Sequence, residues 1–361
     1  MVYGSVYSSI HENSLSSVEP FEFDESMSFM EMGAQTIEES TEDWNNMMKA
    51  IALTELSYVA ETGQELIYEA VDFGAIKDKV VGWFKKLWAK IQGIARAAMA
   101  KFKSLGKDDE GFLSKYTQYF NDGYNKIPSG FSFKGYRYND SIIDNASTLV
   151  SNEAKAEAET ARDVSSFGKK GPDIFDKFPR KIDQYCGRII PGNSGDVSKS
   201  QFTKALTKAF KGSDAKVFLN KNDINVNTLV SHVSGCKTAI DDAKDAESAL
   251  KDSIDSAIDA VETMASKFKD DAIKDGISTD VAGKNRTAAT YFTKYSEFLQ
   301  EINKINTTWF STYISVLKER NRQSKALLVK LVSYANGVGG KKDPTNEAAS
   351  ILEDRFAAIF D

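Results

Sequence analysis

The sequence contains few of the residues that build metal sites and disulfide frameworks. Its 361 residues include two histidines, His11 and His232, and two cysteines, Cys186 and Cys236. This scarcity argues against a zinc cluster, a His-rich metal site and a disulfide scaffold, and we expect no cofactor and no metal. Proline is also rare, with six residues beside 46 basic and 52 acidic ones, which favours long, uninterrupted helices.

Long apolar segments and nucleotide-binding motifs are missing as well. No run of 18 apolar residues is present, so we expect no transmembrane helix. No basic stretch followed by an apolar core opens the chain, so we expect no signal peptide. Gly168-Lys-Lys-Gly171 lacks the spacing and the Ser/Thr of a phosphate-binding loop. These absences point away from an enzyme.

The net charge of −6 hides two oppositely charged blocks. Residues 1–75 hold 15 acidic residues and one lysine, a net charge of −14. Residues 76–107 hold nine basic residues and one aspartate, a net charge of +8. The remainder of the chain is neutral. This distribution favours pairing between the two blocks within one chain, and salt would weaken that pairing.

The sharpest pattern in the sequence is an apolar stripe between residues 76 and 105. Its members recur at steps of three and four, with lysines on the other faces, which predicts a cationic amphipathic helix about 45 Å long. Trp83 and Trp88 widen the stripe, and Gly106 is expected to end the helix. The stripe consists of Ile76, Val80, Phe84, Leu87, Ile91, Ile94, Ala98, Phe102 and Leu105.

The segment before this helix is acidic. Residues 1–39 are rich in Ser, Glu and Met without sustained periodicity, which predicts a flexible acidic tail. A helix over 40–71 is expected to follow, capped by Ser40 or Thr41 and broken near Phe73. Residues 40–107 are therefore predicted to pair an acidic helix with the cationic one.

The middle of the chain, residues 108–232, is expected to be a small mixed α+β domain. Aromatic and polar residues alternate over 129–138, which predicts a strand or a hairpin turning at Gly135. Short helices are expected over 141–165 and 197–211, the second starting at Asp196 or Ser198.

The C-terminal third, residues 233–361, predicts a long helical hairpin followed by a short helix. Apolar residues hold a near-heptad register from 229 to 268, as in a coiled coil, and a second long helix is expected over 285–335. The closing helix is expected over 344–361. The predicted fold is mainly α, with a C-terminal antiparallel hairpin and a small mixed centre. A heptad seam serves pairing within one chain or between chains.

Few residues suggest chemistry. His232 and Cys236 are one helical turn apart, but a nucleophile pair needs a third, orienting group, so core packing is favoured for Cys236. The oxygen-rich segment 220–227 lacks the glycine and glutamate of a calcium loop, so a polar loop is expected. A group of aspartates is expected on the solvent face of its helix: Asp241, Asp242, Asp245 and Asp252.

The cationic helix allows three interpretations. Its apolar stripe can pack on the preceding acidic helix and the body of the protein. Its tryptophans and lysines can instead bind a membrane surface, as in interfacial helices. Nucleic acid is less favoured, because the tryptophans belong to the apolar side and leave no stacking platform. The residues expected to contact a membrane or partner are Lys79, Trp83, Phe84, Lys86, Trp88 and Lys90.

The layout resembles a known class of proteins. An acidic leader, the helix Trp-Phe-Lys-Lys-Leu-Trp-Ala-Lys-Ile at 83–91 and a helical body resemble virion structural and internal head proteins of large tailed bacteriophages. The resemblance covers residues 1–107. It implies a leader trimmed by a head-maturation protease after a glutamate that follows a small or aliphatic residue two positions earlier. Candidate sites are Glu39 in Ile37-Glu38-Glu39, Glu55 in Leu53-Thr54-Glu55 and Glu61 in Val59-Ala60-Glu61.

We therefore expect a non-enzymatic structural protein of a tailed-phage virion, assembled in the host cytoplasm through helix-mediated contacts with itself or with other virion proteins. Its leader, residues 1 to about 65, is expected to be removed or to mask the cationic helix. A membrane-active helical protein, interfacial or pore-forming, that uses the cationic helix over residues 76–105 is the alternative. An enzyme housed in residues 108–232 is a third possibility. No small-molecule substrate is evident.

Overall fold

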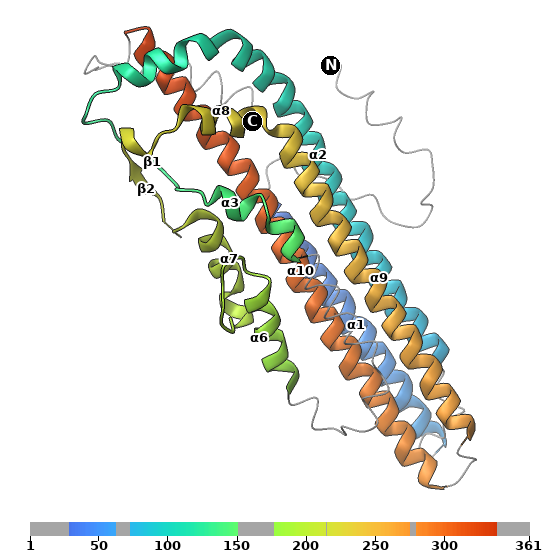
Figure 1. Ribbon diagram of the computed structural model, residues 1–361. Coiled ribbons are helices and arrows are strands. Elements are labelled where there is room, and N and C mark those ends of the chain that lie inside the picture. Colours follow the sequence, from blue (N-terminus) through green and yellow to red (C-terminus); the bar gives the residue numbers. More distant parts are fainter. Residues whose placement is uncertain (1–28, 63–72, 151–176, 214, 275–278, 338–361) are drawn as a thin grey trace, which may run out of the picture.

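The computed structural model describes residues 29–62, 73–150, 177–213, 215–274 and 279–337. The described chain is mainly helical, as predicted, and four long helices form an elongated bundle (Figure 1). The longest has 57 residues and spans about 85 Å at 1.5 Å per residue. The four are α1 (Phe29–Thr62), α2 (Phe73–Lys126), α9 (Cys236–Lys274) and α10 (Thr279–Ala335).

The two C-terminal helices, α9 and α10, form the predicted antiparallel hairpin (Figure 1). Both pack against α2, and α1 packs against α2 and α10. Shorter elements lie along α10 in the mixed part of the chain. They are β1 (Phe133–Gly135), α3 (Asp140–Ile143), α6 (Phe178–Arg188), a 3-10 turn (Lys199–Gln201), α7 (Phe202–Lys211), β2 (Val217–Leu219), a second 3-10 turn (Lys221–Asp223) and α8 (Val226–Ser234).

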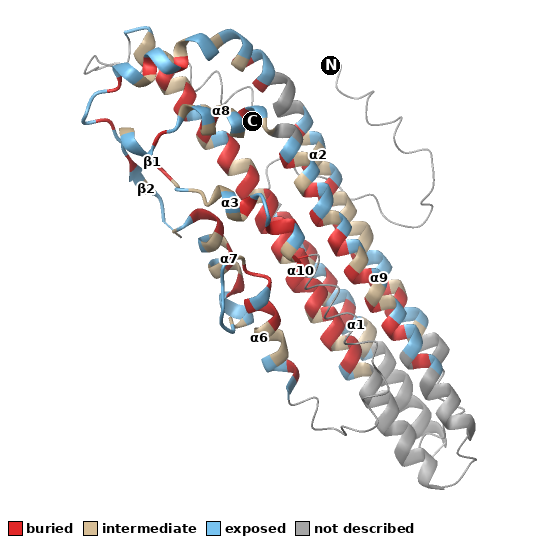
Figure 2. Ribbon diagram, viewed as in Figure 1, coloured by how far each residue is buried: buried red, intermediate tan, exposed pale blue. Residues whose placement is uncertain are grey.

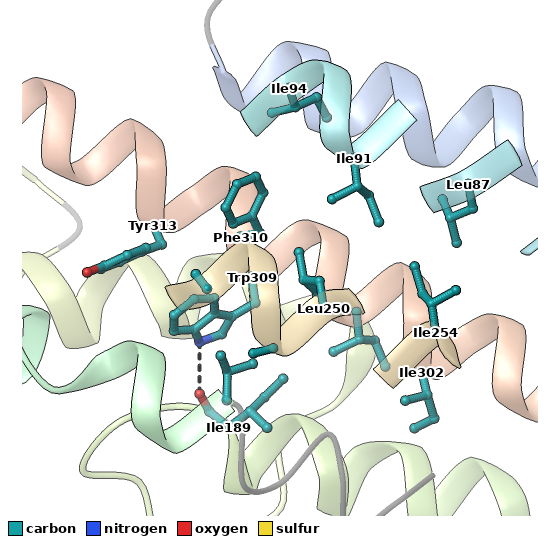
Figure 3. Close-up of a cluster of buried hydrophobic side chains, with 14 of the residues drawn as sticks. Leu87, Ile91, Ile94, Ile189, Leu250, Ile254, Ile302, Trp309, Phe310 and Tyr313 are labelled. Atoms are coloured by element: carbon teal, nitrogen blue, oxygen red, sulfur yellow. Dashed lines mark hydrogen bonds between the residues drawn. The ribbon is translucent and has the colours of Figure 1, made fainter. Parts of the chain in front are cut away.

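The apolar stripe predicted on the cationic helix forms the centre of the core. All of its members with described side chains are at most 1% exposed, and Figure 3 shows Leu87, Ile91 and Ile94 among side chains of α9 and α10, with the burial along the bundle visible in Figure 2. The side chains of Ile76 and Leu105 lie outside the described residues. On α10 the largest buried side chains are Trp309, Phe310 and Tyr313. The periodicity of residues 76–105 therefore identifies a core face of the bundle.

Two helix boundaries differ from the sequence prediction. Helix α1 begins at Phe29, so residues 29–39 belong to a helix and not to the predicted tail. Helix α2 passes Gly106 and ends at Lys126. A single helical glycine costs only about 1 kcal/mol, and beyond it the continued helix makes buried contacts with α10. Its Phe120 is 1% exposed and its Asp109 carboxylate pairs with Lys325 of α10 at 2.5 Å.

Of the two alternatives predicted over 129–138, the strand is confirmed and the hairpin turning at Gly135 is wrong. Strand β1 pairs in antiparallel register with β2, more than 80 residues away, with Lys134 opposite Phe218. The Gln323 side chain on α10 fixes β1, because its Oε1 accepts from the Tyr136 N–H and its Nε2 donates to the Tyr136 carbonyl, both at 2.7 Å. A turn at Gly135 would use the backbone of Tyr136 within the hairpin, and Gln323 would lose its two hydrogen bonds to that backbone. The mixed α+β part is thus present, but residues 108–126 belong to α2.

The remaining helix predictions are met within a few residues where they are described. The helix expected over 197–211 appears as the turn at Lys199–Gln201 and α7. Of the one expected over 141–165, the described residues show α3 and a further helical stretch from 146 to 150. Gly235 separates α8 from α9, which the heptad register did not predict. The expected closing helix over 344–361 lies outside the described residues.

Candidate functional site

The contact between the acidic helix α1 and the cationic helix α2 is the candidate site. Trp83 of α2 is 4% exposed, and its indole N–H donates to the Ser40 carbonyl of α1 at 2.9 Å. The Trp44 ring of α1 meets Trp83 edge to face, with ring centroids 5.0 Å apart. Two tryptophans that pack this way stabilise the contact through their buried area and their ring geometry.

Opposite charges also meet across this contact. The Lys90 ammonium lies 2.9 Å from the Glu39 carboxylate and 3.9 Å from that of Asp43. The hydrogen bond from Lys90 lowers the pKa of Glu39. Because these carboxylates are about half exposed, the pairs add at most about 1 kcal/mol. The tryptophans therefore hold α1 in place more strongly than the charges do.

The predicted contact residues divide between the inside and the outside of the bundle. Lys79 and Lys86 are exposed, Trp88 and Lys90 are partly buried, and Phe84 is fully buried. Trp83 and Phe84 therefore reach a membrane or another protein only if α1 and the rest of the bundle separate from α2.

The three candidate cleavage residues all lie within α1. Glu39 is exposed and lies in the N-terminal third of the helix. Glu55 and Glu61 fall within the bounds of the same helix, and their side chains lie outside the described residues. A protease cleaves an extended chain, so each site requires local opening of α1.

Helix α1 rests on a largely polar face of α10. Gly33 of α1 lies so close to Ser311 that a Cβ at position 33 would overlap the serine side chain. Further buried polar residues lie on the same face of α10, at steps of three and four residues: Ser296, Gln300, Asn303 and Thr307. Ser296 Oγ, Gln300 Nε2 and Asn303 Oδ1 are buried without a hydrogen-bond partner, as is Ser40 Oγ of α1. Such atoms each cost about 1–3 kcal/mol.

Gly33→Ala is expected to loosen α1, because its new methyl group and Ser311 cannot occupy the same space. Overpacking of this kind costs about 1–3 kcal/mol. Ser311→Gly removes the obstructing atoms, so the double variant should recover stability relative to Gly33→Ala alone. Urea unfolding of the two single variants and the double variant measures this coupling. Additive losses would contradict the contact.

A second polar cluster joins α3, α8 and α10, and the sequence did not predict it. His232 of α8 lies between two partners, with Nδ1 2.9 Å from Ser324 Oγ and Nε2 3.0 Å from the Asp140 carboxylate. Arg320 of α10 donates to Asp140 at 3.0 Å and to Asp144 at 3.4 Å. Burial raises the pKa of Asp140, but the hydrogen bond and charge of His232, together with Arg320, outweigh it and lower that pKa.

The serine, histidine and aspartate of this cluster resemble a nucleophile with its base and orienting group. Ser324, however, is 2% exposed, and Arg320 engages the same Asp140 oxygen as His232. A substrate would have to enter the packed α10 face to reach the hydroxyl. The arrangement instead ties α3 and α8 to α10. His232 does have orienting partners, which come from distant segments of the chain. The side chain of Cys236 lies outside the described residues.

One of the aspartates assigned to the solvent face of α9 is partly buried. Burial, with a smaller contribution from the Asp144 carboxylate, raises the pKa of Asp242 to about 6, and its Oδ2 is buried without a partner. Asp241 and Asp245 are exposed as predicted, and Asp252 is intermediate. The prediction for Asp242 is therefore wrong, because α9 turns this residue toward Tyr313 of α10.

Asp242→Asn is expected to stabilise the protein at pH 7.5 but not at pH 4. Between its ordinary pKa of 3.8 and about 6, folded Asp242 keeps a proton that the unfolded chain releases. The contribution of Asp242 to the free energy of unfolding therefore falls as the pH rises from about 3.8 to about 6. After allowance for its partial exposure, we expect a gain of about 1 kcal/mol above pH 6. Urea unfolding at both pH values tests this, with the exposed Asp241→Asn as control. Equal gains at both pH values would contradict the account.

The other residues singled out by the sequence have structural surroundings. Cys186 is buried, and burial raises the pKa of its thiol to about 12, which makes it a poor nucleophile. In the oxygen-rich segment 220–227, Asn220 and Asp223 form a capping box around the turn at Lys221–Asp223. Among the described residues, no three His, Cys, Asp or Glu side chains come together as a metal site.

The helices of the described ranges include none that is long and apolar enough to cross a membrane. Comparisons with protein-family models, curated proteins and solved structures found no match.

Proposed function

We propose that this protein is a non-enzymatic structural component of a tailed-phage virion and that it acts through contacts along its long helices. The layout of residues 1–107 supports this proposal. So does a bundle whose two longest helices span about 80–85 Å, since such a rod can bridge neighbouring subunits.

The observation that carries the proposal is the way α1 is seated. The core formed by α2, α9 and α10 is apolar, and α1 adds Met32 and Trp44 to it, whereas the face of α10 that includes Ser311, next to Gly33 of α1, carries buried polar side chains. Removal of α1 would return these polar groups to water, where their hydrogen bonds are satisfied. Helix α1 is therefore suited to be a removable leader, and it contains all three candidate cleavage residues.

Removal of α1 would also expose Trp83 on the cationic helix, beside the lysines of α2. The exposed strip would provide a docking surface for a neighbouring subunit. The alternative function, membrane activity, follows from the same observation, because an interfacial helix combines tryptophan with lysine. Masking by α1 would then keep the protein inactive until the leader is cut.

Particles purified from the native source test the structural role. Quantitative mass spectrometry across a density gradient should place the protein with the capsid proteins, at a constant copy number per particle after washing in high salt. Recovery only in the particle-free fraction would contradict the proposal. Binding of the cleaved chain to anionic liposomes, lost in Trp83→Ala, would favour the membrane alternative.

A further inference from the structure

The small β-ribbon presents an aromatic and basic face that the proposed function does not use. Strands β1 and β2 turn Phe133, Gly135, Val217 and Leu219 inward, toward a second core beneath the ribbon. The alternation of strand residues places the other side chains outward. Phe218 is 70% exposed, the highest exposure of any large hydrophobic side chain in the described part of the chain. Its direct cross-strand partner on this face is Lys134.

Two lysines lie beside the Tyr136 ring. The Lys216 ammonium lies 5.8 Å from the centre of the ring, and that of Lys211, which is buried and pairs with Glu319, lies 4.1 Å from it. Lys134 and Lys216 are both exposed. We define Lys134, Tyr136, Lys216 and Phe218 as the ribbon face. Residues 202–221, which include α7 and β2, hold five lysines and one aspartate, so the basic character continues beyond the ribbon.

The ribbon face is held rigidly. Gln323 of α10 pairs with both backbone groups of Tyr136 at 2.7 Å. Asn139, just after β1, bonds to the end of α7 through its backbone N–H at 2.9 Å and its side chain at 2.7 Å. A preorganised surface loses little entropy when a ligand binds. These contacts anchor β1, and the strand pairing places Phe218 of β2 directly opposite Lys134.

We propose that the ribbon face binds single-stranded nucleic acid. An exposed ring flanked by lysines provides a stacking surface for an unpaired base and cations for the adjoining phosphates, which are the two elements of sequence-tolerant binding to single strands. A duplex keeps its bases stacked on one another and offers Phe218 no base face. The positive charge of the face complements a polyanion although the whole chain carries −6.

Fluorescence anisotropy with a 5′-labelled 20-residue oligothymidine tests this on the full chain. Phe218→Ala should weaken binding at least about fivefold and leave the salt dependence unchanged, because it removes only stacking. Lys134→Ala/Lys216→Ala should weaken binding and reduce the slope of log K against log salt by about 1 to 1.5. The control Lys244→Ala/Lys251→Ala, on the exposed face of α9, should change neither.

Three outcomes would overturn the proposal. The first is no saturable binding at 50 mM salt. The second is binding that Phe218→Ala leaves unchanged, or that a duplex of equal length matches. The third is binding to phosphatidylglycerol vesicles that oligothymidine cannot displace, which would assign the face to a membrane. Phe218 and the lysines are exposed, so the variants should fold, and unchanged circular dichroism and unfolding midpoints verify this.

Discussion

Trp309→Ala is expected to lower the free energy of unfolding by about 3–5 kcal/mol. Trp309 is fully buried, stacks on Tyr313 with ring centroids 5.0 Å apart, and meets Phe210 of α7 edge to face. Its indole N–H donates to the Ile189 carbonyl at 3.1 Å (Figure 3). Alanine would leave a cavity between α10, α6 and α7 and a buried carbonyl without its donor.

Urea unfolding followed by circular dichroism measures this loss. Trp309→Phe is the matched variant, because it keeps an aromatic ring but removes the hydrogen bond, and it should cost about 1–2 kcal/mol. A loss below about 1 kcal/mol for Trp309→Ala would mean that α6 and α7 do not pack on this part of α10.

Trp44→Ala is expected to release α1 from the bundle. Trp44 is 3% exposed and packs on Trp83, and loss of such a ring costs about 3–5 kcal/mol. The affected contact is local, so the helix should open while α2, α9 and α10 remain folded. At 1.4 kcal/mol per tenfold change, a loss of this size should raise the open population by about a hundredfold to a few thousandfold.

Limited proteolysis with a glutamate-specific protease measures this opening. Cleavage after Glu38 or Glu39 should accelerate strongly in Trp44→Ala, because proteolysis follows the population of the open form when opening is fast. Lys49→Ala, at an exposed position of α1, should cleave at the rate of the unaltered chain. Equal cleavage rates for the two variants would contradict the seating of α1 on Trp83.

The long helices could be predicted from the sequence because their signal is periodic. Nine apolar residues at steps of three and four specify a face over eight turns, and no local feature competes with it. The break assigned to Gly106 shows the limit of local signals. A glycine is a weak helix breaker, and the deciding contacts are those that Phe120 and Asp109 of α2 make with α10, which is distant in sequence.

The polar parts could not be predicted because their partners are distant in sequence. The alternation over 129–138 predicts a strand but does not specify β2 as its partner. His232 contacts Asp140 and Ser324, each 92 residues away in the sequence, and no sequence pattern predicts these two contacts. The pairing of the acidic block with the cationic helix was foreseen from charge, yet the contact depends mainly on Trp44 and Trp83.

The N-terminus of the mature chain tests the central claim most directly. Peptide-mapping mass spectrometry of the protein from purified native particles should find a first residue of Ser40, Leu56 or Thr62, the positions that follow Glu39, Glu55 and Glu61. A start at Leu56 or Thr62 would mean that Trp44 is removed and that the cationic helix is uncovered in the particle. A start at Ser40 would remove only the part of α1 that precedes its contacts with Trp83. Peptides from before Glu39, present in equal amount to the rest of the chain, would contradict the claim that α1 is a removable leader.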